Sequence, residues 1–229
     1  MAGSGFQFHK AKSAGAGPTE KVKGLASTQY ARGDALVVTA GTGTKASATS
    51  KITHIVEAMY TRDDLNRPAT ELLTTAKDEP LFCIPVAGGN IILRSDLRGD
   101  AAPPINGTAC NSNSTTTELK VTAAGSTNDY NDGQCYVPEL DEQRLITADS
   151  VSGGVHTFTV TPAFRRAPTT GDTVIAVPFS KGATAVKLNA TTPHQCISTA
   201  VADKTGGHVK IEDVDLKNLI VYTSHPDQE

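Results

Sequence analysis

The chain has 229 residues, a formal net charge of −3 and no tryptophan, and 38% of its residues are hydrophobic. This length suits one large or two small domains, and the small negative charge argues against nucleic-acid binding, which normally requires a clustered basic patch. No run approaches the roughly 18 apolar residues of a transmembrane helix, and the N-terminus lacks the apolar segment of a signal peptide. We therefore expect a soluble protein made in a cytoplasm, with neither nucleic acid nor membrane as a partner.

Residues 1–24 are rich in Gly, Ala and Ser and contain too little apolar surface to fold alone. Phe6 and Phe8 stand out in this segment because two aromatic residues at strand spacing can anchor a chain in the groove of a partner. The segment also carries four lysines, which are Lys10, Lys12, Lys21 and Lys23. It is interpreted either as a frayed terminus or as an extended arm that becomes ordered on a neighbouring subunit, with these six residues as its partner-binding site.

Residues 25–100 are expected to form a first β domain. Strands are predicted at residues 35–40 and 51–60 and in the runs PLFCI and NIILRSD. The stretch GTGTKAS between the first two strands is expected to be a hairpin loop, because a phosphate-binding loop needs a different glycine spacing and a following helix. The stretch RPATELLTTAKDEP offers the one plausible helical turn. Pro80 and Pro85 favour an edge strand or a strand end for the LFCI run.

Residues 101–178 are expected to form a second β domain, joined to the first by a linker that Pro103 and Pro104 stiffen. Short runs rich in Thr, Val and Ile alternate here with clusters of Gly, Asn, Asp and Ser. Strands are predicted at residues 118–122, 134–138, 143–147, 156–161 and 173–177. Strands of about five residues at roughly 8–12-residue spacing are typical of an all-β sandwich or barrel.

Residues 179–229 are predicted to end in two strands, HVKIEDV and NLIVYTS, that complete domain 1 or domain 2. A weak internal echo links the two halves of the chain. Residues 78–96 align without gaps to residues 171–189, and both segments contain an apolar quartet, a proline, a turn with glycine and a second apolar run. The echo indicates either one strand-turn-strand device used twice or a coincidence between two generic hairpins.

Few residues have the spacing of a catalytic or metal site. His54 and Glu57 are three apart, so in a strand they point to opposite faces and cannot ligate one metal. The other histidines are expected to be solvated; they are His9, His156, His194, His208 and His225. The acidic pairs are expected in turns or on exposed strand edges; they are Asp63-Asp64, Asp78-Glu79, Asp141-Glu142 and Glu212-Asp213. We expect no enzymatic activity and no cofactor.

Three further motifs have simple structural interpretations. The stretch STNDYNDGQ faintly resembles a calcium loop but lacks its residue order and its closing Glu. Arg-Gly-Asp occurs at residues 32–34 and 98–100, where Gly-Asp is expected to form a turn before a strand. No two cysteines form a C-x-x-C pair, so we expect mostly buried, reduced thiols, although four cysteines would permit two disulfides.

Residues 107–178 resemble a β module that recurs in virion proteins of tailed bacteriophages. The matching pieces are GTA at 107–109, NDYNDG at 128–133, QRLIT at 143–147 and VTPAF at 160–164. One departure is that Asp141 and Glu142 replace the glycine-rich approach usual before the Gln. The stretch ARGDALVVTAGTGTKASATSKITHIVEAMYT is similar to the start of phage capsid decoration (cement) proteins, except that His54 replaces a glycine.

The resemblance implies two small antiparallel β-barrel or β-sandwich (tulip-like) units and an extended N-terminal arm. It also implies a structural protein of the virion, bound to the major capsid protein on the outer surface of an icosahedral head. The expected oligomer is a homotrimer at local threefold axes, with no catalytic residues. The alternatives are a tail, head-tail connector or head-fibre component, a carbohydrate-binding or adhesin-like β module suggested by the Asn/Asp/Thr loops, and a hydrolase with a scattered site. The lack of tryptophan argues against the carbohydrate-binding alternative.

Overall fold

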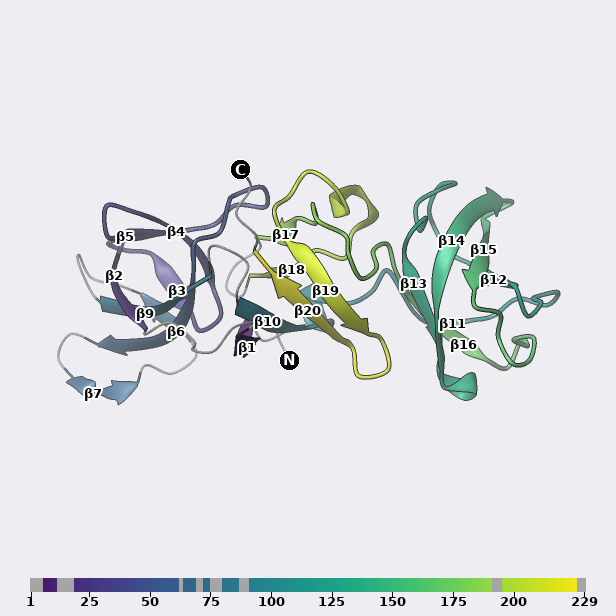
Figure 1. Cartoon of the computed structure of the whole chain (residues 1–229), viewed down its shortest axis with the longest axis horizontal. Helices are drawn as coiled ribbons and strands as arrows, with labels where there is room; N and C mark the ends of the chain where they lie inside the picture. Colours follow the sequence, from purple (N-terminus) through teal and green to yellow (C-terminus); the bar gives the residue numbers. More distant parts are fainter. Residues whose placement is uncertain are drawn as a thin grey trace.

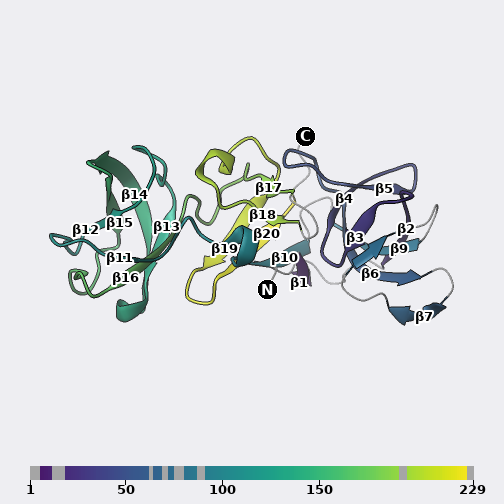
Figure 2. The same ribbon diagram turned by 180° about the vertical axis from the view of Figure 1, so that it is seen from behind.

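The computed structural model describes residues 6–11, 19–61, 64–68, 72–74, 80–86, 91–190 and 195–225. Within these ranges the regular elements are β-strands and three short 3-10 helices, which confirms the all-β prediction. No helix in these ranges is long and apolar enough to cross a membrane. Three β units follow one another along the long axis of the molecule, as Figure 1 and the reverse view in Figure 2 show.

The first unit is a closed N-terminal barrel. Its strands are β2 (Glu20–Gly24), β4 (Ala35–Thr39), β5 (Thr42–Lys45), β6 (His54–Thr61) and β9 (Pro80–Pro85). They pair in the order β4-β5-β2-β9-β6, and the pairing of β4 with β6 closes the ring. Strand β7 (Asp64–Pro68) pairs antiparallel with β6, while β3 (Gln29–Ala31) and β8 (Leu72–Thr74) form a separate pair.

The barrel interior requires a glycine in β5. A Cβ on Gly43 would lie 2.9 Å from Val22 Cγ1 and 3.0 Å from Leu36 Cδ1, closer than packed carbons normally approach.

The stretch GTGTKAS is not the loop that the sequence predicted. The hairpin turns earlier, at Ala40 and Gly41, whose φ angles of 48° and 77° fit a tight type I′ turn and allow the following residues to form β5.

Two further expectations for the first unit differ from the structure. Leu72–Thr74, in the segment expected to hold a helical turn, is the strand β8 and pairs with β3. Strand β9 is not at an edge, because it pairs with β2 on one side and β6 on the other. Pro80 and Pro85 are its first and last residues, so the strand-end interpretation of the two prolines holds.

The second unit, the central unit, is built from both halves of the chain. Its sheet has the order β1 (Gln7–Ala11), β10 (Ile91–Asp96), β20 (Ile220–Ser224) and β19 (Lys210–Asp215). Residues 178–190 and 195–209 pack beside this sheet and include the short pair β17 (Leu188–Asn189) and β18 (Cys196–Ile197). The C-terminal segment thus forms the central unit together with β1 and β10, whereas the sequence predicted that it completes domain 1 or domain 2.

The third unit, the outer module, comprises residues 105–177. Its strands are β11 (Ile105–Ala109), β12 (Glu118–Thr122), β13 (Gln134–Val137), β14 (Glu142–Ser152), β15 (Val155–Thr161) and β16 (Thr173–Val177). The sheet has the order β11-β16-β13-β14-β15-β12 and curls until Cys110 and Val121 form an isolated bridge between its edges. It encloses a core of its own, which includes Leu119, Phe158 and Val174.

Residues 1–24 do not form an arm in the part of the segment that the structure describes. Strand β1 pairs with β10 of the central sheet, and β2 pairs with β5 and β9 of the barrel. Main-chain pairing needs few apolar side chains, and Phe6 and Val22, which are 1% and 3% exposed, supply the apolar anchors. The low hydrophobicity of the segment therefore did not predict that β1 and β2 are paired strands.

The echoing segments 78–96 and 171–189 are not hairpins. Strand β9 lies in the barrel and β10 in the central sheet, while β16 lies in the outer module and β17 in the central unit. In both segments an apolar strand ends near a proline, Pro85 or Pro178, and the next apolar run belongs to a different sheet. The shared pattern thus marks the two places where the chain leaves a flanking unit for the central one.

We expect Gly133→Ala to destabilise the outer module by about 2 kcal/mol or more, because a Cβ there would lie 2.4 Å from the Val177 carbonyl oxygen and 2.8 Å from the Tyr130 carbonyl oxygen. Both obstacles are backbone, so a side-chain rotation cannot relieve them. Gly171→Ala is the matched control, because no atom lies within 4 Å of a Cβ at that position. Thermal unfolding monitored by circular dichroism measures both variants, and equal melting temperatures would contradict the expectation.

Candidate functional site

One side of the junction between the outer module and the central unit is closed by hydrogen bonds. The Gln143 side chain of β14 donates from Nε2 to the Val214 carbonyl oxygen at 2.7 Å, and its Oε1 accepts from the Leu216 amide at 2.8 Å. Beside it, Lys217 Nζ lies 2.9 Å from Asp141 Oδ2. These contacts attach the module to the hairpin between β19 and β20, so the two units dock in a defined orientation.

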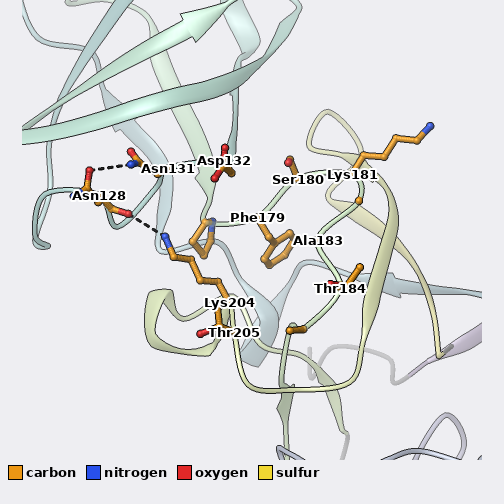
Figure 3. Close-up of a pocket in the computed structure, with 13 residues that line it drawn as sticks. Asn128, Asn131, Asp132, Phe179, Ser180, Lys181, Ala183, Thr184, Lys204 and Thr205 are labelled. Atoms are coloured by element: carbon orange, nitrogen blue, oxygen red, sulfur yellow. Dashed lines mark hydrogen bonds between the residues drawn. The ribbon is translucent and has the colours of Figure 1, made fainter. Parts of the chain in front are cut away.

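The other side of the same junction is open and forms a cleft of about 790 Å³. Loop residues of the outer module line one wall, and two segments of the central unit line the other. The lining residues are Asn128, Asn131, Asp132, Pro178, Phe179, Ser180, Lys181, Gly182, Ala183, Thr184, Ala185, Lys204 and Thr205. Figure 3 shows the two walls and the side chains between them. Ligand sites occur preferentially at such domain junctions, which makes this cleft the candidate functional site.

The module wall of the cleft is held by a buried Asp-His pair. Asp149 and His156 are 2% and 0% exposed, and Asp149 Oδ1 lies 2.8 Å from His156 Nδ1. The other carboxylate oxygen of Asp149 accepts from the Tyr130 amide at 3.1 Å, and the Asp149 amide donates to Asn131 Oδ1 at 2.6 Å. Asn131 Nδ2 in turn donates to Asn128 Oδ1 at 2.8 Å. The wall is thus fixed before any ligand arrives.

Lys204 crosses the cleft from the central unit. Its Nζ donates to the carbonyl oxygens of Asn128 at 2.9 Å and Asp129 at 3.0 Å, and Figure 3 shows the side chain reaching the loop of the module. The ammonium group therefore ties the open side of the junction to the same loop that the Asp-His pair holds. The cleft is bounded by fixed contacts on both sides.

The opposite wall, residues 180–185, is held by the backbone of the central unit. The Gly182 amide donates to the Ile211 carbonyl at 2.9 Å, and the Ile211 amide donates to the Ala183 carbonyl at 2.7 Å. The Gly207 amide donates to the Ala185 carbonyl at 2.7 Å. This wall therefore follows strand β19 and has little freedom to close on the module.

The sequence-predicted partner-binding residues are not brought together in one arm. Phe6 lies in the core between the barrel and the central sheet, so it does not face a partner, whereas Phe8 is 39% exposed on β1. Lys21 and Lys23 are exposed on β2, alternating with the buried Val22. The backbone of Lys10 lies in β1, but its side chain lies outside the described part, as does Lys12 altogether.

His225 is buried beside Phe6, which corrects the expectation of solvated histidines. The two rings meet edge to face at 5.8 Å, and His225 is 2% exposed. Neither ring nitrogen has a hydrogen-bond partner among the described residues. Burial alone lowers the pKa of His225 from 6.5 to about 3, so the ring is neutral in the folded chain at neutral pH. His156 is the second buried histidine, while His9 and His194 lie outside the described side chains.

The residues that the sequence places in pairs contact different partners in the structure. His54 Nε2 lies 3.1 Å from Glu20 Oε2, and Glu57 Oε1 lies 2.6 Å from Arg32 Nη2. The acidic pair Asp141-Glu142 is not uniformly exposed, because Glu142 is 4% exposed and bonds the guanidinium groups of Arg144 and Arg165. Asp63, Asp78 and Glu79 lie outside the described residues.

The first Arg-Gly-Asp motif forms a turn whose carboxylate is inaccessible. Asp34 is 0% exposed, its Oδ2 accepts from the Ala31 amide at 2.7 Å, and Lys45 Nζ lies 2.8 Å from the same oxygen. Burial raises the pKa of Asp34, while the contact with Lys45 opposes that rise. In the second motif Gly99 has a φ of 59° and begins a short 3-10 helix. The first motif is the turn before a strand that the sequence predicted, since β4 begins at Ala35, whereas the second begins a 3-10 helix and the next strand, β11, starts only at Ile105.

The loop with the faint calcium pattern already satisfies several of its own groups. Asp129 Oδ2 accepts from the Ser126 amide at 2.6 Å, and Asn131 bonds Asn128 and Asp149 through its side chain. No group of three or more potential metal ligands occurs in the described part of the chain. The loop is thus arranged as a wall of the cleft.

The four cysteines are free and buried, as the sequence predicted. Burial raises the pKa of Cys83, Cys110 and Cys135 to about 12, so these thiols remain protonated at neutral pH. They pack as small apolar side chains in the two flanking units.

Sequence reasoning missed the cleft and Lys204. The side chain that crosses the cleft and the loop it contacts are 76 residues apart, and the spacing of a single lysine carries no signal. A usable signal was the polar turn SKGAT at residues 180–184, which directly follows Phe179, separates two apolar runs and forms one wall.

We expect Gln143→Ala to loosen the outer module, because it leaves the Val214 carbonyl and the Leu216 amide without their partner at the junction. Amide hydrogen exchange at residues 214–216 should accelerate, and proteolysis in the linkers should quicken. Gln134→Ala is the matched control, since Gln134 accepts a hydrogen bond from Gln143 within the module and, among the described residues, has no hydrogen bond to residues 214–216. Unchanged exchange in Gln143→Ala would contradict the assignment.

We expect His225 to make the fold acid-sensitive. The unfolded chain binds a proton at this ring below pH 6.5, whereas the folded chain binds it only below about pH 3. The free energy of unfolding therefore falls as the pH drops from 6.5 toward 3. From pH 6.5 to pH 5 the loss is about 2 kcal/mol at 1.36 kcal/mol per unit. Urea unfolding at pH 7 and pH 5 should show this loss in the wild type and a smaller one in His225→Leu. Equal pH dependence in both proteins would refute the assignment.

The chain matches no known family model, no curated protein and no solved structure. Its function is therefore inferred from its own residues and geometry.

Proposed function

We propose that the protein is a structural component of a phage virion that binds the major capsid protein on the outer surface of an icosahedral head and stabilises contacts between capsomers. The observation that carries the proposal is the coincidence of a sequence resemblance with a structural unit. The phage-like pattern spans residues 107–178, and the outer module, with its own sheet and core, spans residues 105–177. A resemblance of weak pieces gains weight when all of them fall within one folding unit.

The arrangement of the three units also supports the proposal. A cement protein adds free energy by burying surface against subunits that are already folded, so it needs rigid units that present extended surface rather than a reaction centre. The barrel and the central sheet share one hydrophobic cluster, which includes Ile55, Leu93 and Val221. Gln143 and Lys204 fix the outer module on the far side of the central unit. The chain can therefore act as one elongated body.

The residues proposed to contact the capsid are the exposed members of the N-terminal set. Phe8 on β1 is 39% exposed, and Leu25, which directly follows β2 and lies outside that set, is 40% exposed. Lys21 and Lys23 are exposed on β2. Exposed apolar side chains together with lysines suit an acidic, partly apolar patch on the major capsid protein.

Cosedimentation with heads assembled from the major capsid protein of the same genome tests this function. We expect the wild-type protein to pellet with heads and, as a homotrimer, to saturate at a copy number divisible by three. The triple variant Phe8→Ser, Lys21→Glu, Lys23→Glu should lose about tenfold or more in affinity, because it removes an apolar anchor and reverses two charges. Lys120→Glu, on β12 of the outer module, is the control and should bind as the wild type does.

A protein that folds but does not pellet with heads would refute the decoration role. If it instead pellets with tails or connectors, the tail, head-tail connector or head-fibre alternative applies. Wild-type binding by the triple variant would leave the role standing and refute the proposed contact residues.

A further inference from the structure

The cleft between the outer module and the central unit has no part in the proposed capsid contact, since its walls come from loop 128–132 and from residues 178–185 and 204–205. Its volume of about 790 Å³ falls in the range of roughly 300–1,000 Å³ that small-ligand sites occupy. Both walls are held by hydrogen bonds within their own units. A site with fixed walls binds with little loss of conformational entropy.

The free polar groups of the cleft are hydroxyls and a carboxylate. Asp132, Ser180, Thr184 and Thr205 have no side-chain hydrogen bond or ion pair among the described residues, although all four line the cleft. Figure 3 shows Asp132 and Ser180 on facing walls, while Lys181 extends away from the cleft. A carboxylate that accepts hydrogen bonds on the module wall therefore faces hydroxyls that both donate and accept on the other wall.

The remaining lining residues of the central unit are small or apolar; they are Pro178, Phe179, Gly182, Ala183 and Ala185. A ligand with polar edges and a C–H face would match this combination of polar and apolar lining residues. The pyranose ring is such a ligand, and a carboxylate can accept hydrogen bonds from two neighbouring hydroxyls.

A peptide fits the cleft less well. Peptides commonly bind by adding a strand to a free edge, which requires unpaired backbone groups. On the wall formed by residues 180–185 the Gly182 amide and the carbonyls of Ser180, Ala183 and Ala185 already bond within the central unit. The polar groups of the cleft that remain available to a ligand are mostly side-chain hydroxyl and carboxylate groups. These groups favour a ligand that is recognised through its own hydroxyl groups.

We propose that this cleft binds a short oligosaccharide, with Asp132 accepting hydrogen bonds from sugar hydroxyls and Ser180, Thr184 and Thr205 completing the contacts. Binding at a single site is carried by hydrogen bonds without an exposed aromatic platform, so the affinity is modest, on the order of 0.1–1 mM. Several copies on one particle would raise the effective affinity. The property goes beyond the proposed capsid role and does not depend on it.

The test is binding of the full-length protein to a glycan array of immobilised di- to tetrasaccharides, followed by titration calorimetry with the free form of each sugar that is retained. We expect at least one sugar to bind the wild type. Asp132→Asn, which keeps a residue that tolerates the φ of 62° at this position, should weaken binding about tenfold. Thr184→Trp should abolish binding by filling the cleft.

Two matched variants serve as controls and should bind as the wild type does. Glu118→Gln removes one carboxylate from β12, and Thr170→Trp places the same bulky residue in an exposed turn; neither position lines the cleft. Retention of no sugar, or binding that survives both cleft variants, would overturn the proposal. A displayed peptide library gives a second way to contradict the proposal. If no sugar is retained but the library yields peptides that bind the wild type and do not bind Thr184→Trp, the cleft binds a protein partner instead.

Discussion

The pairing of β10 with β20 is the contact on which the arrangement of the whole chain depends. It joins residues 93–96 to residues 220–223, so the chain that leaves the central sheet after β10 must return to it for β19 and β20. The outer module meets this requirement because its first and last strands, β11 and β16, pair with each other. The chain therefore enters and leaves the module at one edge, which is the condition under which a domain can be inserted into another without disturbing it.

Each flanking unit is attached to the central one by the same kind of polar contact. Gln195 of the central unit accepts from the Ala35 amide at 2.7 Å and donates to the Ala46 carbonyl, both in the barrel. Gln143 of the outer module makes the equivalent pair of bonds to the Val214 carbonyl and the Leu216 amide of the central hairpin. A primary amide that completes two backbone hydrogen bonds sets orientation in a way that apolar packing alone does not, because a shifted junction would leave several polar groups unpaired.

The difference between what the sequence could and could not predict follows the range of the interactions. Strands β12 and β16 were predicted at their observed bounds, since alternation and turn residues are local signals. Strands β1 and β2 were missed because their pairing partners, β10 and β9, lie far along the chain and a polar segment gives no local sign of them. The cleft was missed for the same reason: Lys204 and Asn128 meet only once the module has docked.

The two proposed surfaces lie in different parts of the elongated body. Lys21 and Lys23 belong to the barrel, and Phe8 belongs to the neighbouring central unit. The cleft lies where the outer module meets the central unit. Figures 1 and 2 show that the outer module lies at the opposite end of the body from the barrel. Attachment through the barrel would hold the cleft away from the shell, where a soluble or cell-bound glycan could reach it. The closed side of the junction keeps the module from swinging, so the cleft would keep its shape and its direction on every copy. A rigid insertion is thus suited to displaying a weak site many times, and multiple copies are what a weak site requires.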